Sequence, residues 1–148
     1  MARTGATSRR NFRFNTNAGQ VDTFSVIGGT NISYGFVLGD ITNSSGTVNF
    51  TNAAKVYIGA GGMTSNTIST LNVALNNGGS FGANDDWSSG VSVILAGGAF
   101  DCATLDGTAR NITLNNVLRG AGALNKNGAG SLILNAAETY TGNTVVNQ

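Results

Sequence analysis

Residues 120–146 read GAGALNKNGAGSLILNAAETYTGNTVV, and this stretch decides the fold that the sequence predicts. Its closely spaced glycines first suggest a phosphate-binding loop. However, the third glycine of the G-x-G-x-x-G fingerprint is missing, and no amphipathic helix follows. The stretch instead alternates apolar and polar residues, then passes through a turn into a β-branched run. We therefore interpret it as strands and turns of a structural scaffold.

The composition of the 148-residue chain favours strands over helices. It contains 22 Gly, no Pro, no His and only 10 % charged residues, and Gly, Asn, Thr and Ser favour turns and strands. Hydrophobic residues make up 41 % of the chain and recur in short clusters, which argues against disorder. The sequence predicts one all-β domain with its own core.

Short predicted strands recur about every ten residues, as in all-β architectures with a turn after each strand. They cover residues 23–27, 32–38, 47–51, 55–58, 67–75, 91–95, 99–105, 111–114, 123–126, 131–135 and 144–146. Gly- and Asn-rich groups such as residues 59–62 separate them. Alternation predicts one buried face, which fits a sandwich, a barrel or a solenoid. Uniformly short strands with Asn at their ends favour the solenoid, because stacked Asn side chains can bond along a column.

Residues 118–148 closely resemble the autotransporter-associated β-strand repeat of bacterial passenger domains. That repeat reads approximately G-x-G-x-L-x-K-x-G-x-G-x-L-x-L, then a short spacer and Y-T-G-x-T-x-V. The matching positions are Gly120, Gly122, Leu124, Lys126, Gly128, Gly130, Leu132, Leu134, Tyr140, Thr141, Gly142, Thr144 and Val146. The resemblance implies a right-handed parallel β-helix over residues 15–148, at the bacterial cell surface or outside the cell. It also implies a structural role, with no catalytic or cofactor-binding residue in the repeat.

Alternation within the motif predicts which side chains enter the core. We expect Leu124, Leu132 and Leu134 to point inward, and Ile133 to point outward as an apolar surface residue. The sequence Tyr-Thr-Gly-Asn at 140–143 reads as a turn in which Gly142 adopts a positive φ.

The N-terminal residues 1–14 carry Arg3, Arg9, Arg10 and Arg13. We expect a mobile basic segment, with contact to an anionic surface as the alternative. No aromatic platform accompanies these arginines, so the sequence predicts no nucleic-acid partner. We expect no signal peptide and no membrane span in the chain, since no long apolar run occurs.

The expected β-helix has open strand edges at its ends, which suggests self-assembly. One predicted edge is formed by Thr144, Val145 and Val146, and the other by the alternating segment that holds Phe12 and Phe14. A strand from one copy lying across the open end of the next would build a head-to-tail fibre. The alternative is that the edge continues into the rest of a longer β-helix. In either case the expected role is that of a structural stalk or spacer.

The rival function is a carbohydrate-binding or carbohydrate-cleaving β-helix acting around Asp85, Asp86 and Trp87. A Trp ring can stack on a sugar, and glycoside cleavage uses paired carboxylates. However, Asn-Asp-Asp is also an ordinary turn sequence. Cys102 reads as a small buried hydrophobe, because the chain has no His to activate a thiol. We therefore predict no catalytic residue, no cofactor and no metal site, and expect the chain not to be an enzyme.

Overall fold

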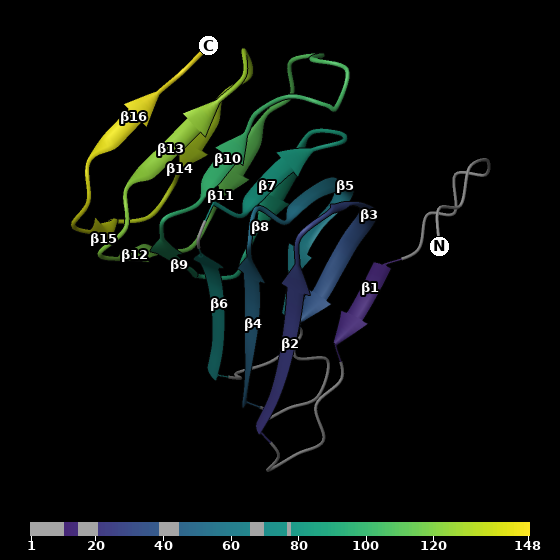
Figure 1. The fold of residues 1–148 in the computed structure, drawn as a ribbon, viewed down its shortest axis with the longest axis vertical. Helices are drawn as coiled ribbons and strands as arrows, with labels where there is room; N and C mark the ends of the chain where they lie inside the picture. The colour runs from purple at the N-terminus through teal and green to yellow at the C-terminus, as the bar shows by residue number, and fades with distance from the viewer. Residues whose placement is uncertain (1–10, 15–20, 39–44, 66–69, 77) are drawn as a thin grey trace.

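The computed structural model describes residues 11–14, 21–38, 45–65, 70–76 and 78–148. Every regular element in this part of the chain is a strand, and no helix occurs in it. The paired strands run parallel and form a 10-stranded and a 6-stranded sheet, both curled (Figure 1). The all-β class and the parallel pairing agree with the prediction from the sequence.

The strands stack in three rows, named here after one member of each. The β6 row contains β2 (Val21–Ile27), β4 (Ser45–Thr51), β6 (Thr70–Asn76), β9 (Val93–Ala96), β12 (Leu118–Gly120) and β15 (Thr139–Tyr140). The β7 row contains the first parts of β3 (Thr30–Leu38) and β5 (Lys55–Thr64), then β7 (Ser80–Ala83), β10 (Ala99–Asp101), β13 (Leu124–Asn127) and β16 (Thr144–Val146). The β8 row contains β1 (Asn11–Phe14), the second parts of β3 and β5, then β8 (Trp87–Ser89), β11 (Ile112–Leu114) and β14 (Leu132–Leu134).

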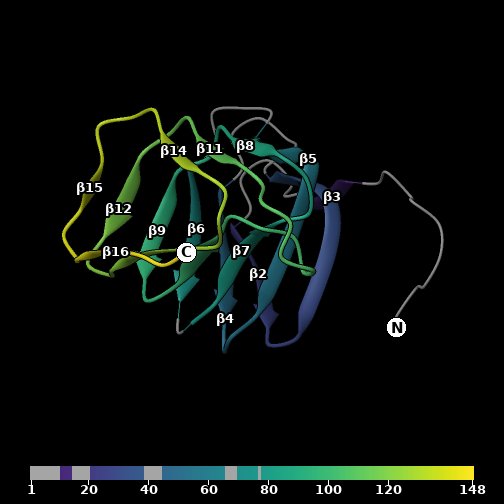
Figure 2. The same cartoon turned by 90° about the horizontal axis from the view of Figure 1, so that it is seen from above.

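The chain visits the three rows in a constant order, from the β8 row to the β6 row to the β7 row. The strands β6, β9, β12 and β15 lie side by side in the view from above (Figure 2). Each passage through the three rows therefore lays one layer of strands on the layer before it.

The core lies between the rows, where aromatic side chains from all three meet. Phe50 of the β6 row packs edge-on against Phe81 of the β7 row, with ring centroids 4.7 Å apart. Phe81 in turn packs edge-on against Trp87 of the β8 row at 6.5 Å and contacts Phe100 of the next layer at 5.9 Å. All four side chains are buried. Edge-to-face contacts at these separations stabilise aromatic clusters beyond their buried area.

Side-chain amides link successive layers at the strand ends, which confirms the expected Asn columns. The side-chain Nδ2 of Asn127 donates to the Asp101 carboxylate at 2.8 Å, and the side-chain Nδ2 of Asn147 donates to the side-chain Oδ1 of Asn127 at 3.0 Å. A second column joins Asn135 to Asn115 at 2.8 Å. Because these pairs lie in equivalent positions of adjacent layers, they help to fix the register of the stack.

Several strands differ from those predicted. The strands β7, β8, β12 and β15 were not expected from the sequence. Residues 59–62 were expected to be a separator, whereas β5 continues through them and joins two rows. Gly62 permits this path because its φ is +61° and a Cβ there would lie 2.1 Å from the Ser88 carbonyl oxygen. The β10 strand ends at Asp101 rather than at residue 105.

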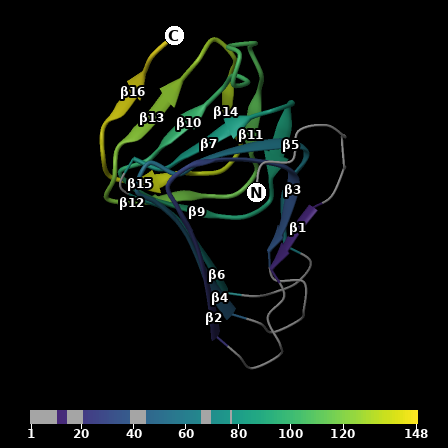
Figure 3. The same ribbon diagram turned by 45° about the vertical axis from the view of Figure 1, so that its right-hand side comes forward.

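The N-terminal arrangement also differs from the expected one. Residues 1–10 lie outside the described residues, but residues 11–14 form β1, which pairs in parallel with β3 of the same chain (Figure 3). The sheets therefore begin at residue 11, and not at the expected boundary of residue 15. The segment that holds Phe12 and Phe14 pairs with β3 through one edge, and its expected contact with a neighbouring copy stays a prediction.

Candidate interaction site at the C-terminal end layer

The strands β14, β15 and β16 form the last layer of the three rows, called here the end layer. Within the described residues, each of them pairs with a single strand: β14 with β11, β15 with β12, and β16 with β13. The outer edge of each strand therefore presents backbone N–H and C=O groups that no ladder bond uses. Such edges are templates for pairing with another strand.

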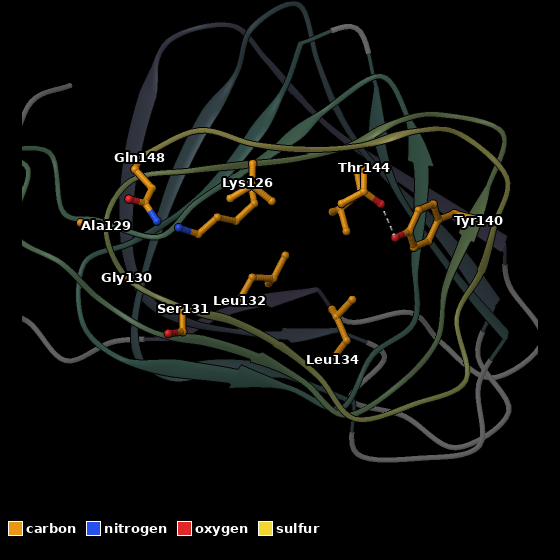
Figure 4. Close-up of a pocket in the computed structure, with 11 residues that line it drawn as sticks. Lys126, Ala129, Gly130, Ser131, Leu132, Leu134, Tyr140, Thr144 and Gln148 are labelled. Carbon is orange, nitrogen blue, oxygen red and sulfur yellow. Dashed lines mark hydrogen bonds between the residues drawn. The ribbon is translucent and has the colours of Figure 1, made fainter.

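The end layer surrounds a hollow of about 410 Å³ (Figure 4). Its wall is largely apolar and includes Leu124, Leu132, Leu134, Tyr140 and Val146. Leu124 is buried, and Leu132 and Leu134 are half-buried, whereas Ile133 between them is 43 % exposed. The predicted inward and outward positions of these four side chains are thus confirmed.

Lys126 brings one positive charge into this apolar wall. Its strand position lies between Phe100 of the layer below and Val146 of the end layer. The side chain is only 8 % exposed, and its ammonium group donates to the carbonyl oxygen of Gly128. It is the only charged side chain among those that line the hollow. Lys126 was expected only as a position of the motif; its spacing of two from Leu124 would have predicted the inward face.

The residues expected to form the two assembly edges lie in two different strands. Thr144, Val145 and Val146 form β16, where Val146 is 60 % exposed and the Thr144 hydroxyl bonds the Tyr140 hydroxyl at 2.8 Å. Phe12 and Phe14 belong to β1, at the opposite end of the β8 row from β14 (Figure 3). The structure therefore places the two predicted edges at opposite ends of the molecule.

Trp87 does not provide the exposed ring that a sugar would stack on. Its side chain is 4 % exposed, its ring packs against Phe81 in the core, and its Nε1–H donates to the Gly82 carbonyl oxygen at 3.2 Å. The hydrogen bond satisfies the indole N–H, as is usual for a buried Trp. A buried ring offers no stacking surface to a sugar, so the structure gives the expected glycan contact at this residue no support.

Asp85 and Asp86 hold neighbouring layers together. The Asp86 carboxylate accepts the backbone N–H of Asn111 at 2.8 Å, and the Asn111 side chain repeats the arrangement by accepting the N–H of Ser131 at 3.0 Å. The exposed Asp85 carboxylate lies 3.7 Å from the Arg110 guanidinium. A shallow depression of about 380 Å³ beside Trp87 has Asp86 as its only lining carboxylate. Two carboxylates flanking a bond, which glycoside cleavage requires, do not line it.

Cys102 is buried in the core, as expected for a small apolar side chain. Burial raises the pKa of the thiol to about 11, against a smaller lowering effect of the Lys126 charge. The thiolate that a nucleophile needs is thereby disfavoured.

The described part of the chain holds neither a metal-ligand cluster nor a membrane-spanning helix. No three His, Cys, Asp or Glu side chains gather there to hold a metal ion. None of its elements is a helix of the length and apolar character that crossing a membrane requires. Comparison of the chain with protein-family models, with curated proteins and with solved structures gave no match.

Proposed function

We propose that the chain is a structural module, a right-handed parallel β-helix of the bacterial cell surface that serves as a stalk or spacer. In this proposal each layer of strands is one coil of the helix, and further coils pair with the exposed edges of the end layer. A second copy, stacked head to tail, is the first occupant to test.

The observation that carries the proposal is the constant row order from β1 to β16. Each layer repeats the sequence of rows, the strands pair in parallel with a matched register, and the core is continuous from layer to layer. Repeat architectures stabilise themselves through such contacts between neighbouring units. The polar side chains of Asp85, Asp86 and Asn111 bond one layer to the next, which also favours a structural role.

The order of the rows at the two ends supports head-to-tail stacking. The described chain starts with β1 in the β8 row and finishes with β16 in the β7 row, and the β8 row always follows the β7 row along the chain. The first layer of a second copy would place β1, β2 and β3 over β14, β15 and β16. A non-closing contact of this kind generates filaments.

Light scattering after size-exclusion chromatography, over a range of concentrations, tests the stacking. We expect concentration-dependent oligomers, and filaments in negative-stain micrographs. The variant Val146→Lys, which places a second charge in the hollow, should weaken self-association at least about tenfold, because a buried unpaired charge is costly. The matched variant Val145→Lys changes the neighbouring residue of the same strand.

Alternation along β16 gives Val145 the opposite face from Val146, away from the hollow. Its replacement should therefore have a smaller effect on stacking. A chain that stays monomeric at its highest soluble concentration would contradict head-to-tail stacking. Equal weakening by both variants would show that the hollow is not the contact surface.

A further inference from the structure

We propose that Lys126 makes the C-terminal hollow selective for a partner strand that carries a carboxylate among apolar residues. This inference rests on the proposed function, because it states what chemistry the added coil brings to the open end layer. The partner is an extended acidic segment that pairs with the outer edge of β16 and turns its Asp or Glu side chain into the hollow.

The Lys126 ammonium group is incompletely paired. An ammonium group has three N–H donors, and the structure gives this one a single acceptor, the Gly128 carbonyl oxygen. No carboxylate in the described residues forms an ion pair with it. The nearest acid on the adjacent strand, Asp101, shares its register position with Asn127 and accepts that amide instead. A cation that is 8 % exposed and paired with one neutral oxygen favours an incoming anion.

An apolar wall surrounds this charge. Leu124, Leu132, Leu134 and Tyr140 line the same hollow, so a fully hydrated ion would leave most of the wall uncovered. A ligand that fits must combine apolar groups with one anionic group. Complementary charges within an apolar contact surface favour the right partner over others.

The unpaired edge of β16 indicates that the ligand is an extended peptide strand. Thr144 and Val146 of β16 line the hollow, and the backbone groups on the outer edge of β16 have no ladder partner in the described chain. A peptide can satisfy those groups while its alternate side chains enter the hollow, which is the mode of strand addition. A fatty acid would satisfy the charge and the wall but not the edge.

A second copy of the chain fits this charge less well than an acidic strand does. In the β7 row the inward-facing residue of the first layer is Asn31. In a second copy stacked on the end layer, Asn31 would lie over Val146 of the first copy. An amide oxygen is a neutral acceptor, and hydrogen bonds in which both groups are ionised are stronger. We therefore expect a carboxylate at this position to bind more tightly than an amide.

Two matched peptides test the selectivity on the full chain. Both carry a fluorophore and the sequence of residues 136–148, one with Val146→Glu and the other with Val146→Gln. Fluorescence anisotropy should show about tenfold tighter binding of the Glu peptide, equivalent to one charge-assisted contact. With the Lys126→Met chain, the two peptides should bind within about twofold of each other.

The outcomes separate this inference from the proposed function. Equal binding of both peptides to the unmodified chain, or a preference for Glu that survives Lys126→Met, would overturn the role of Lys126 while leaving strand addition intact. If neither peptide binds, the inference is wrong whatever the oligomeric state; if the chain also stays monomeric, coil addition fails with it. Because the peptide comparison uses the unmodified chain, it does not depend on how well Lys126→Met folds.

Discussion

Gly142 lies where the backbone of the end layer closely approaches the layer below, and Gly142→Ala should loosen that end layer. A Cβ at this position would lie 2.3 Å from the Gly122 carbonyl oxygen and 2.6 Å from the Ala123 nitrogen. Both are backbone atoms, so no side chain can rotate to make room. The end-layer backbone around Gly142 must therefore move outward.

The size of the effect follows from the backbone hydrogen bonds that the movement breaks. Three backbone hydrogen bonds of 2.8–2.9 Å join the end layer to the layer below in this region. The donors are the amides of Leu124, Thr141 and Asn147, and the acceptors are the carbonyls of Asn143, Gly120 and Lys126. At about 1 kcal/mol net for each bond, the opening of the end layer becomes easier by about 3 kcal/mol. This corresponds to about a hundredfold change in the opening equilibrium.

Native-state hydrogen exchange measures this opening directly. We expect the Thr141 and Asn147 amides to exchange about a hundredfold faster in Gly142→Ala, while the Ser80 amide of an inner layer keeps its rate. Gly90→Ala is the matched control, since its Cβ would meet no atom within 4 Å and its φ is not positive. Unchanged protection in Gly142→Ala would refute the close approach, and equal losses in both variants would point to a general effect of alanine.

Three more predictions concern the core, the Asn columns and the buried thiol. Phe81→Ala should lower the free energy of unfolding in urea by about 4 kcal/mol, because the ring contacts Phe50, Trp87 and Phe100; a loss under 1 kcal/mol would contradict a central position for Phe81. Asn127→Ala should cost about 2 kcal/mol and Asn147→Ala about 1 kcal/mol in the same assay, because Asn127 bonds both neighbouring layers; the reverse order would contradict the column. Alkylation of Cys102 in the folded chain should be slow at pH 8 and accelerate as the pH rises toward 11, since burial raises the thiol pKa to about 11; a plateau near pH 9 would show an unperturbed thiol.

The sequence alone predicted those features that depend on local patterns. Alternation in the 47–51 and 131–135 segments identified real strands with one buried face, because a strand turns successive side chains to opposite sides whatever it pairs with. The Asn columns were also predictable, since Asn recurred at strand ends and needed a partner there.

The features that the sequence did not reveal depend on contacts between distant layers. The β7 strand lacks an alternating signal because Gly82 lies under the Tyr57 ring, where a Cβ would come within 2.5 Å of it. Trp87 fits both a surface platform and a core position, and only the pairing of β8 with β11 places it inside. Gly142 was expected to need a positive φ, whereas its observed constraint is the space left by the neighbouring backbone.

The polarity of the inward-facing residues in the β7 row changes with their depth in the stack. From the first layer to the end layer they are Asn31, Val56, Phe81, Phe100, Lys126 and Val146. The middle positions are apolar because strands cover them on both sides, whereas Asn31 is exposed. Lys126 departs from this trend, since it lies one layer below the end and is already buried.

Any layer added over β16 would remove the remaining water from the Lys126 ammonium group. A purely apolar layer would then enclose a cation whose described partner is one carbonyl oxygen, at a cost of several kcal/mol. A layer that brings a carboxylate would offset this desolvation with a direct ion pair. In our proposal the same lysine disfavours the stacking of an uncharged layer on these open strand edges and favours a partner strand that carries a carboxylate.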